Sequence, residues 1–160
     1  MINGEKQIWE VLKHVFDPEM PSISVIDLGM IEAVTLTGSH VRIEVLPTFT
    51  GCPALEMIAK NIANTVTKMA EGLDVDVQFI YDPIWTSNRI TREGRNRLKQ
   101  FGIAPPPDSF EEIWSIHCPY CDSPYTEVDS IFGPTACRSL LYCKSCKNPF
   151  EAMKPISTMI

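Results

Sequence analysis

Two Cys-x-x-Cys pairs near the C-terminus constrain this sequence more than any other feature. Cys118 and Cys121 form the first pair, Cys143 and Cys146 form the second, and 21 residues separate the two pairs. This spacing is close to that of a zinc ribbon, in which each pair lies in a tight turn and four thiolates complete a tetrahedron around one ion. The sequence therefore predicts a four-cysteine metal site.

Four thiolates fill the coordination sphere, so the predicted site is structural and leaves no open position for catalysis. A rubredoxin-like iron centre uses the same ligands, but rubredoxins carry glycine after each pair, where this chain has Asp122 and Lys147. This difference favours zinc over iron. So small a module lacks a sufficient core of its own, and zinc binding supplies on the order of 10–16 kcal/mol of coupled folding. Strands are expected over residues 126–130 and 139–142, around a turn at 132–135.

Composition narrows the classes of protein that the chain can represent. Its N-terminus lacks the basic and apolar segments of an export signal, which predicts a cytoplasmic protein. In that reducing compartment, cysteine pairs indicate metal or thiol chemistry rather than disulfides. The net charge of −6 argues against a nucleic-acid partner, and no apolar run approaches the ~20 residues that span a membrane.

Hydrophobic periodicity in the first 80 residues predicts an α+β domain. Residues 5–16 are typical of an amphipathic helix with Asn3 as its N-cap, and a loop follows over residues 17–29. Residues 30–37 and 40–46 are then expected to form a hairpin about Gly38-Ser39.

A longer helix and a third strand complete the predicted α-β-β-α-β order. The helix covers residues 54–70, with Pro53 at its first helical position and Gly72 at its end. Alternation of apolar and polar residues predicts the strand over residues 75–79, which gives a sheet with helices on one face.

A short polar helix is expected from Thr91 to Phe101, ended by Gly102. The proline-rich segment 103–108 is interpreted as a stiff spacer between domains. We therefore expect domains over residues 1–104 and 105–160.

Cys52 is a second candidate functional residue. It precedes the long predicted helix, where free amide groups and the helix dipole favour a thiolate that acts as a nucleophile or a soft-metal ligand. The alternative is a small apolar side chain that fills space beneath the loop. No histidine lies close to Cys52 in the sequence as a general base, so metal handling fits better than hydrolysis.

The remaining cysteine and the histidines have less specific interpretations. Cys137 is interpreted as a core cysteine or a spare thiol. His117 adjoins a predicted ligand but finds no vacancy on the ion, whereas His14 and His40 are expected on the surface. Ile84, Trp85, Phe110 and Trp114 suggest either a docking surface or the packing of two domains.

Three motifs resemble the iron-sulfur assembly-factor domain of SufT-like bacterial proteins, over residues 5 to about 85: Asp17-Pro18-Glu19, Asp27-Leu28-Gly29 and Thr48-x-Thr50-Gly51-Cys52-Pro53. Further motifs make the whole chain similar to the PaaD (PaaJ) family, which is encoded with the multicomponent phenylacetyl-CoA epoxidase of aerobic phenylacetate catabolism. These are Trp85-Thr86, Gly94-Arg95-x-Arg97-Leu98, Gly102-Ile103-Ala104-Pro105-Pro106 and the ribbon with Thr135-Ala136-Cys137.

The resemblance implies an accessory, non-enzymatic protein that helps the di-iron oxygenase or the iron-sulfur reductase of that system to acquire its metal centre. It implies that Cys52 transiently holds iron or an iron-sulfur cluster, and the residues considered as its neighbours are Asp17, Glu19, Asp27, Thr48 and Gly51. The chain has no helical Glu-x-x-His pair and no glycine-rich dinucleotide motif, so it is not expected to be the oxygenase or the reductase itself. A docking subunit and a rubredoxin-like electron carrier are the alternative functions left open, and a homo-oligomer is left open as the state of assembly.

Overall fold

The computed structural model describes residues 4–107 and 115–154, and the chain divides into two compact units. The first unit comprises the chain up to Thr48 together with residues 53–85, and the second comprises residues 49–52 together with the chain from Thr86 onward. The sequence placed the boundary after residue 104, whereas these units divide after Trp85.

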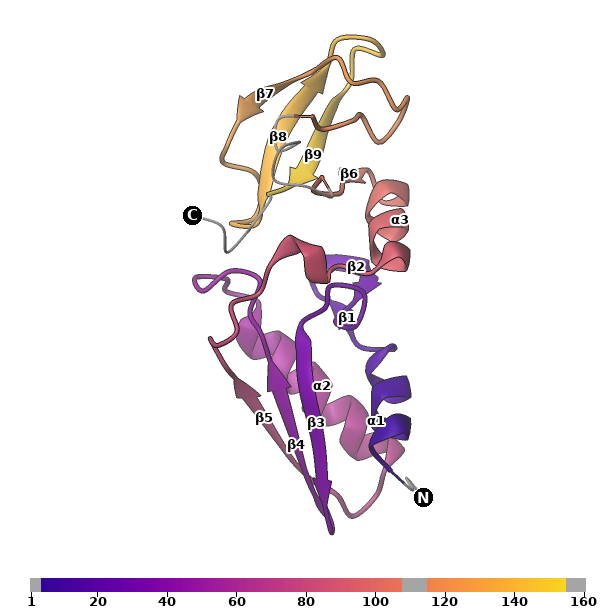
Figure 1. Ribbon diagram of the computed structural model, residues 1–160, viewed down its shortest axis with the longest axis vertical. Helices are drawn as coiled ribbons and strands as arrows, with labels where there is room; N and C mark the ends of the chain where they lie inside the picture. The colour runs from indigo at the N-terminus through magenta and orange to yellow at the C-terminus, as the bar shows by residue number, and fades with distance from the viewer. Residues whose placement is uncertain (1–3, 108–114, 155–160) are drawn as a thin grey trace. The chain divides into compact units, whose positions relative to one another are not determined.

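A three-stranded sheet with two helices builds the first unit (Figure 1). Strand β3 (Ile31–Thr37) pairs antiparallel with β4 (His40–Val45), and β4 pairs parallel with β5 (Asp74–Phe79). Helices α1 (Glu5–Leu12) and α2 (Leu55–Met69) pack against this sheet and against each other. The predicted α+β class is confirmed, and the three-stranded sheet and its helices follow the predicted α-β-β-α-β order, with two short strands, β1 and β2, added between α1 and β3.

The core of this unit follows from the two periodicities in the sequence. Alternation in β4 places Val41, Ile43 and Val45 on one face, and all three side chains are fully buried. Helix α2 contributes its buried side chains at spacings of four residues, Ile58, Ile62 and Val66. Each such side chain contributes about 1.5–3 kcal/mol by leaving water, so the pairing of sheet and helix holds the unit together.

The opening segment differs from the prediction. Helix α1 ends at Leu12, and β1 (Phe16–Asp17) pairs with β2 (Met20–Ser24) inside the segment expected to be helix and loop. The physical reason is Asp17, whose carboxylate accepts hydrogen bonds from the amides of Glu19 and Met20 at 2.7 and 3.2 Å. The proline after Asp17 disfavours helix there, and the side chain stabilises a turn instead.

Helix α2 begins one residue later than expected. Its N-cap is Ala54, so Pro53 lies outside the helix rather than at its first position. Gly72 follows the end of the helix with a φ of 88°, a conformation that glycine adopts without strain, as its place in the sequence predicted.

The second unit contains one capped α-helix within the described residues. The Thr91 hydroxyl accepts a hydrogen bond from the amide of Gly94 at 2.9 Å, which caps helix α3 (Arg92–Gln100) as predicted. A single 3-10 turn, η1 (Ser87–Arg89), precedes the helix, and Gly102 ends it with a φ of 84°.

A four-stranded sheet in the order β6-β9-β8-β7 forms the rest of the unit (Figure 1). Strands β7 (Thr126–Ser130) and β8 (Arg138–Cys143) match the predicted pair, whereas β9 (Pro149–Met153) was not expected. Strand β6 (Ile103–Ala104) pairs parallel with β9, so these two residues belong to the ribbon sheet rather than to a spacer. Asp108, the end of the predicted spacer, lies outside the described residues.

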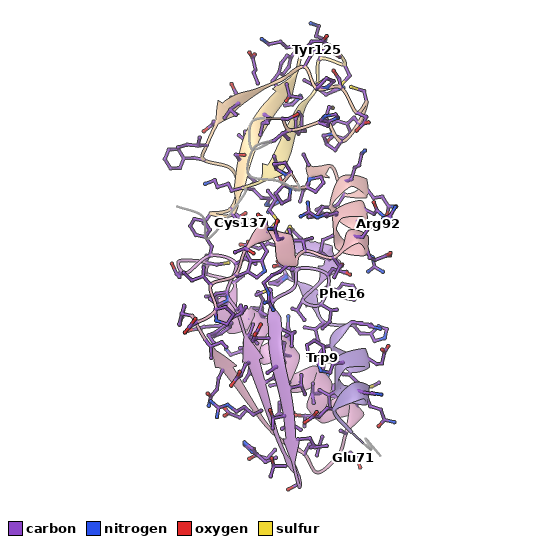
Figure 2. The ribbon with its side chains drawn as sticks, viewed as in Figure 1. Trp9, Phe16, Glu71, Arg92, Tyr125 and Cys137 are labelled. Carbon is purple, nitrogen blue, oxygen red and sulfur yellow. The ribbon has the colours of Figure 1, made fainter. Side chains whose placement is uncertain are left out.

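Figure 2 draws the side chains of the described residues on the ribbon. Trp85 belongs to the core of the first unit. Its side chain is 2% exposed, and its indole nitrogen donates a hydrogen bond to the carbonyl of Leu28 at 2.7 Å. The suggestion that it forms part of an exposed docking surface is therefore wrong. Ile84 is 64% exposed, and Phe110 and Trp114 lie outside the described residues.

Replacing Trp85 with phenylalanine should destabilise the first unit by about 1–3 kcal/mol, because the buried Leu28 carbonyl loses its donor and packing volume is lost. Replacement with alanine should cost more, about 3–5 kcal/mol. Urea denaturation followed by far-UV circular dichroism measures both changes. Equal midpoints for Trp85→Phe and the wild type would contradict the structural role of this hydrogen bond.

Candidate functional site

The sulfur atoms of the four ribbon cysteines converge on one point. The Sγ atoms of Cys118, Cys121, Cys143 and Cys146 all lie within 4.8 Å of one another. Cys118 and Cys146 approach to 3.7 Å, and Cys121 and Cys143 approach to 3.6 Å. Four Zn–S bonds of about 2.3 Å in a tetrahedron require sulfur separations close to these. Within residues 4–107 and 115–154, this is the one group of three or more metal-ligand side chains.

The two cysteine turns have the same local geometry. The amide of Asp122 donates to the carbonyl of Cys118, and that of Lys147 donates to the carbonyl of Cys143, both at 2.9 Å. Asp122 and Lys147 have φ angles of 60° and 61°, in the left-handed region that favours glycine. Each turn therefore reverses the chain at some cost in backbone strain, and the amide of Cys146 points to the Cys143 sulfur at 3.5 Å.

The pKa values of the cluster's thiols indicate which of them ionise without a bound cation. The pKa of Cys118 is raised, chiefly by burial. A backbone hydrogen bond from Ser123 favours the Cys121 thiolate, but desolvation and the neighbouring sulfurs outweigh it and raise that pKa to about 11. Hydrogen bonding by Asn148 lowers the pKa of Cys146 to about 6. The Cys146 thiolate is thus stable at neutral pH, whereas Cys118 and Cys121 need a bound cation before they ionise.

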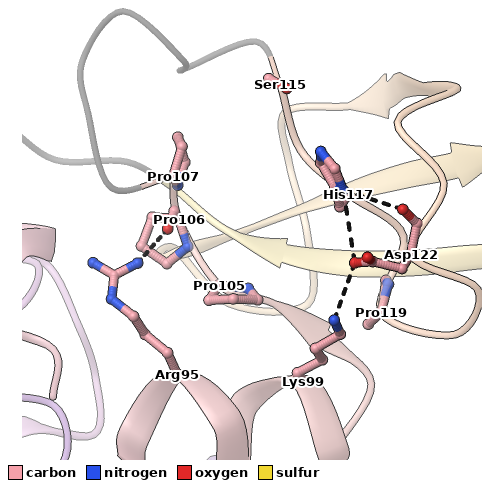
Figure 3. A pocket seen from close by; sticks show the side chains of 9 residues that line it. All are labelled: Arg95, Lys99, Pro105, Pro106, Pro107, Ser115, His117, Pro119 and Asp122. Carbon is pink, nitrogen blue, oxygen red and sulfur yellow. Dashed lines mark hydrogen bonds and ion pairs between the residues drawn. The ribbon is translucent and has the colours of Figure 1, made fainter. Parts of the chain in front are cut away.

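A small brace joins helix α3 to the first cysteine turn. The Lys99 ammonium lies 3.1 Å from the Asp122 carboxylate, and the His117 ring nitrogen lies 3.6 Å from it (Figure 3). The hydrogen bond and charge of Lys99 lower the pKa of Asp122. These groups line a pocket of about 320 Å³ whose other walls include prolines 105–107 and 119. Lys99 and His117 both contact Asp122 and so stabilise the first cysteine turn, and His117 lies outside the group of four cysteines.

Cys137 and the other histidines have ordinary environments. Cys137 is buried, and its sulfur lies 3.3 Å from the Thr135 hydroxyl, which confirms its interpretation as a core cysteine. His14 is exposed, and His40 is an exposed partner of Asp74 at 2.9 Å. The sequence missed this pair because the parallel register of β4 and β5 brings together two residues that are 34 positions apart.

The Cys52 turn belongs to the same compact unit as the ribbon. The Cys52 amide donates to the Phe49 carbonyl at 3.2 Å, which closes the turn, and the Cys52 side chain is half-buried and not in a disulfide. Gly51 is exposed, and a Cβ atom there would meet nothing within 4 Å. Thr48 is half-buried at the end of the first stretch of the other unit.

The acidic residues considered as neighbours of Cys52 stabilise turns. Asp17 accepts the two amide hydrogen bonds described above, and Asp27 accepts one from the amide of Ser24 at 3.1 Å. The Ser24 hydroxyl accepts in return from the amide of Asp27 at 3.0 Å. Glu19 is half-buried in the first of these turns. The motifs that carry Asp17 and Asp27 therefore shape the backbone of the first unit, and a metal-binding role for either stays a prediction.

Fold and site together define a protein that joins an iron-sulfur-assembly-type α+β domain to a four-cysteine β-ribbon. The first part matches the family model for iron-sulfur cluster assembly proteins over residues 5–79, and the second matches that for the PaaD zinc beta ribbon domain over residues 103–154. The chain belongs to the PaaD family. It is 38% identical to an Escherichia coli (strain K12) protein provisionally named as a subunit of 1,2-phenylacetyl-CoA epoxidase, over 94% of this chain and 92% of that protein.

Other similarities cover about three fifths of the chain. A Porphyromonas gingivalis protein named as an Fe-S protein maturation auxiliary factor is 28% identical over 61% of this chain and 92% of its own length. A domain of unknown function from Bacillus anthracis, known as a crystal structure, has the same fold with a TM-score of 0.56 and 23% identity, over 59% of this chain and 90% of its own. The helices within the described residues are all too short or too polar to span a bilayer.

We expect the purified chain to carry one tightly bound metal ion, and Cys143→Ser to lose it. Cys143 is both a ligand and a fully buried residue of the ribbon core, so its replacement should unfold the ribbon while the first unit stays folded. Mass spectrometry of metal content and hydrogen exchange measure these two effects. Cys137→Ser, which changes a cysteine outside the cluster, is the control, and metal retention by Cys143→Ser would contradict the assignment.

Metal affinity should rise steeply with pH. At pH 7.5 the raised pKa values keep Cys118 and Cys121 protonated in the metal-free ribbon, so binding an ion releases at least these two protons. The apparent association constant should therefore increase by roughly 100-fold or more per pH unit between pH 6.5 and 8.5. Competition with a chelator of known pH dependence measures this slope. A slope below tenfold per unit would contradict the proposed protonation states.

Proposed function

We propose that this protein is a non-catalytic maturation factor for a metal centre of the phenylacetyl-CoA epoxidase system, and that Cys52 transiently holds the iron or iron-sulfur cargo. The observation that carries the proposal is similarity over almost the whole chain to a protein named as a subunit of that epoxidase, together with an N-terminal domain related to Fe-S maturation factors. The oxygenase and the iron-sulfur reductase component are the two candidate clients.

The different environments of the ribbon cysteines and of Cys52 support this function. The ribbon cysteines form a closed tetrathiolate that fits zinc, with no ligand position left for a substrate or for cargo. Cys52 lies outside that group, in a short turn ahead of α2, with its side chain half-buried. A single thiolate on a turn provides one soft ligand, and the client protein or a small thiol completes the coordination sphere until the cargo moves on.

Two alternatives rest on particular features. In a docking subunit, the ribbon would bind the epoxidase components without metal transfer, which fits the exposed aromatic side chains of Tyr120, Tyr125 and Phe132. In a rubredoxin-like electron carrier, the tetrathiolate would hold iron. Asp122 and Lys147 at the glycine-like positions of both turns continue to favour zinc.

The test is co-expression of the epoxidase components with the wild-type chain, with Cys52→Ala, with Thr50→Ala and without the chain. We expect Cys52→Ala to reduce client iron content and epoxidase activity to the level without the chain, because the transfer thiol is lost. Thr50→Ala, an exposed change in the same turn, should behave as the wild type. Iron and zinc analysis of each purified component provides the measurement.

Each outcome separates the candidates. If Cys52→Ala keeps ribbon zinc and matches the wild type, the protein is a docking subunit and the transfer role is wrong. An iron-containing ribbon with the visible absorption of a ferric tetrathiolate would instead identify an electron carrier.

A further inference from the structure

Lys154, directly after strand β9 of the ribbon, contacts the Cys52 turn through the ring of Phe49. Its ammonium group lies 5.9 Å from the centre of the Phe49 ring and 6.0 Å from the centre of the Phe132 ring. Phe49, Cys52, Phe132 and Lys154 all belong to the second compact unit. A cation at these distances from two aromatic rings is attracted to both, and this lysine has no carboxylate partner among the described residues.

The ribbon sheet positions the backbone of Lys154. Its amide donates to the carbonyl of Cys137 at 2.8 Å, which continues the antiparallel ladder beyond Arg138 and Met153. Arg138, whose side chain is almost fully buried, pairs with Glu151 at 2.6 Å and holds the same ends of β8 and β9. Strand β8 ends at the ligand Cys143, and β9 starts three residues after the ligand Cys146, so metal binding organises both strands that position Lys154.

Gly133 sets the course of the backbone next to one of the two rings, that of Phe132, whose side chain is 78% exposed. A Cβ atom at this position would lie 2.6 Å from the carbonyl oxygen of Arg138, so only glycine allows the turn after Phe132 to approach β8 this closely. The other ring is held by the Cys52 turn itself, because the Phe49 carbonyl accepts the hydrogen bond from the Cys52 amide. The lysine therefore bridges a turn of the ribbon and the turn that carries the proposed transfer thiol.

We propose that Lys154 is a positioning residue that couples metal occupancy of the ribbon to the conformation of the Cys52 turn. The inference rests on the proposed function for the meaning of Cys52, but the contact itself is independent of it. A metal-loaded ribbon holds β8, β9 and Lys154 in place, and the ammonium then restrains the turn through Phe49. A metal-free ribbon releases this restraint, so an immature protein does not present an ordered Cys52 turn to a client.

The experiment compares amide hydrogen exchange at residues 49–52 in zinc-loaded wild type, Lys154→Met, Lys154→Arg and Lys144→Met. In Lys154→Met, methionine keeps the length of the apolar lysine stem but removes the charge. Exchange at residues 49–52 should therefore become about two- to fivefold faster, as expected for loss of one exposed cation–π contact. Arginine keeps the cation and should restore the wild-type rate. Lys144 pairs with Glu127 at 2.8 Å. Lys144→Met removes the same charge away from Phe49, so it should leave exchange at residues 49–52 unchanged.

Two further measurements separate coupling from general loosening. Phe49→Leu should speed exchange to the same extent as Lys154→Met, and the double variant should be no faster than either single variant. Chelation of zinc should accelerate exchange in the wild type and change little in Lys154→Met. Wild-type exchange in zinc-loaded Lys154→Met, or additive effects in the double variant, would overturn the proposal. Neither result depends on epoxidase activity, so a failed transfer role and a failed coupling are distinguishable.

Discussion

Four thiol groups within 4.8 Å of one another are the constraint on which the second unit depends. Without a cation, burial first and the neighbouring sulfurs second raise the pKa values of Cys118 and Cys121 and oppose their ionisation. A divalent cation reverses this balance, because each thiolate then faces two positive charges rather than other anions. The ribbon core is small, and Cys118 and Cys143 of the candidate metal site are two of its buried residues, so we expect metal binding and folding of the ribbon to be one process.

The first unit is held together in a different way. Its sheet buries a continuous row of branched side chains against two amphipathic helices, and its turns are closed by Asp17 and Asp27 rather than by metal. Hydrophobic burial supplies its stability, so we expect this unit to fold without an ion. The segment of greatest functional interest interrupts this unit in sequence and groups in space with the ribbon. The hydrophobic core that stabilises the first unit and the Cys52 turn that carries the proposed chemistry therefore belong to different units.

Secondary structure was predictable where a local pattern carried it. Helix α2, the hairpin of β3 and β4, and the Thr91 cap of α3 each follow from periodicity or from one hydrogen-bonding side chain. Strands β1 and β6 have two residues each, and no periodicity is visible in so short a segment. They form because the tertiary fold brings β2 beside β1 and β9 beside β6, where the strands pair. The prolines after Ala104 indicated a spacer, yet the two residues before them complete a sheet.

The sequence by itself indicated the four cysteines of the candidate metal site, the class of the fold and the family, because cysteine spacing, hydrophobic period and motifs are local properties of the chain. Tertiary structure alone decided which partners the remaining polar groups find. Lys99 reaches Asp122, Trp85 reaches the Leu28 carbonyl, and Lys154 reaches the ring of Phe49. These residues are 23 to 105 positions apart, and no local preference records such pairs. They form because burial of the two cores brings distant segments together, after which charge and hydrogen bonding select the contacts.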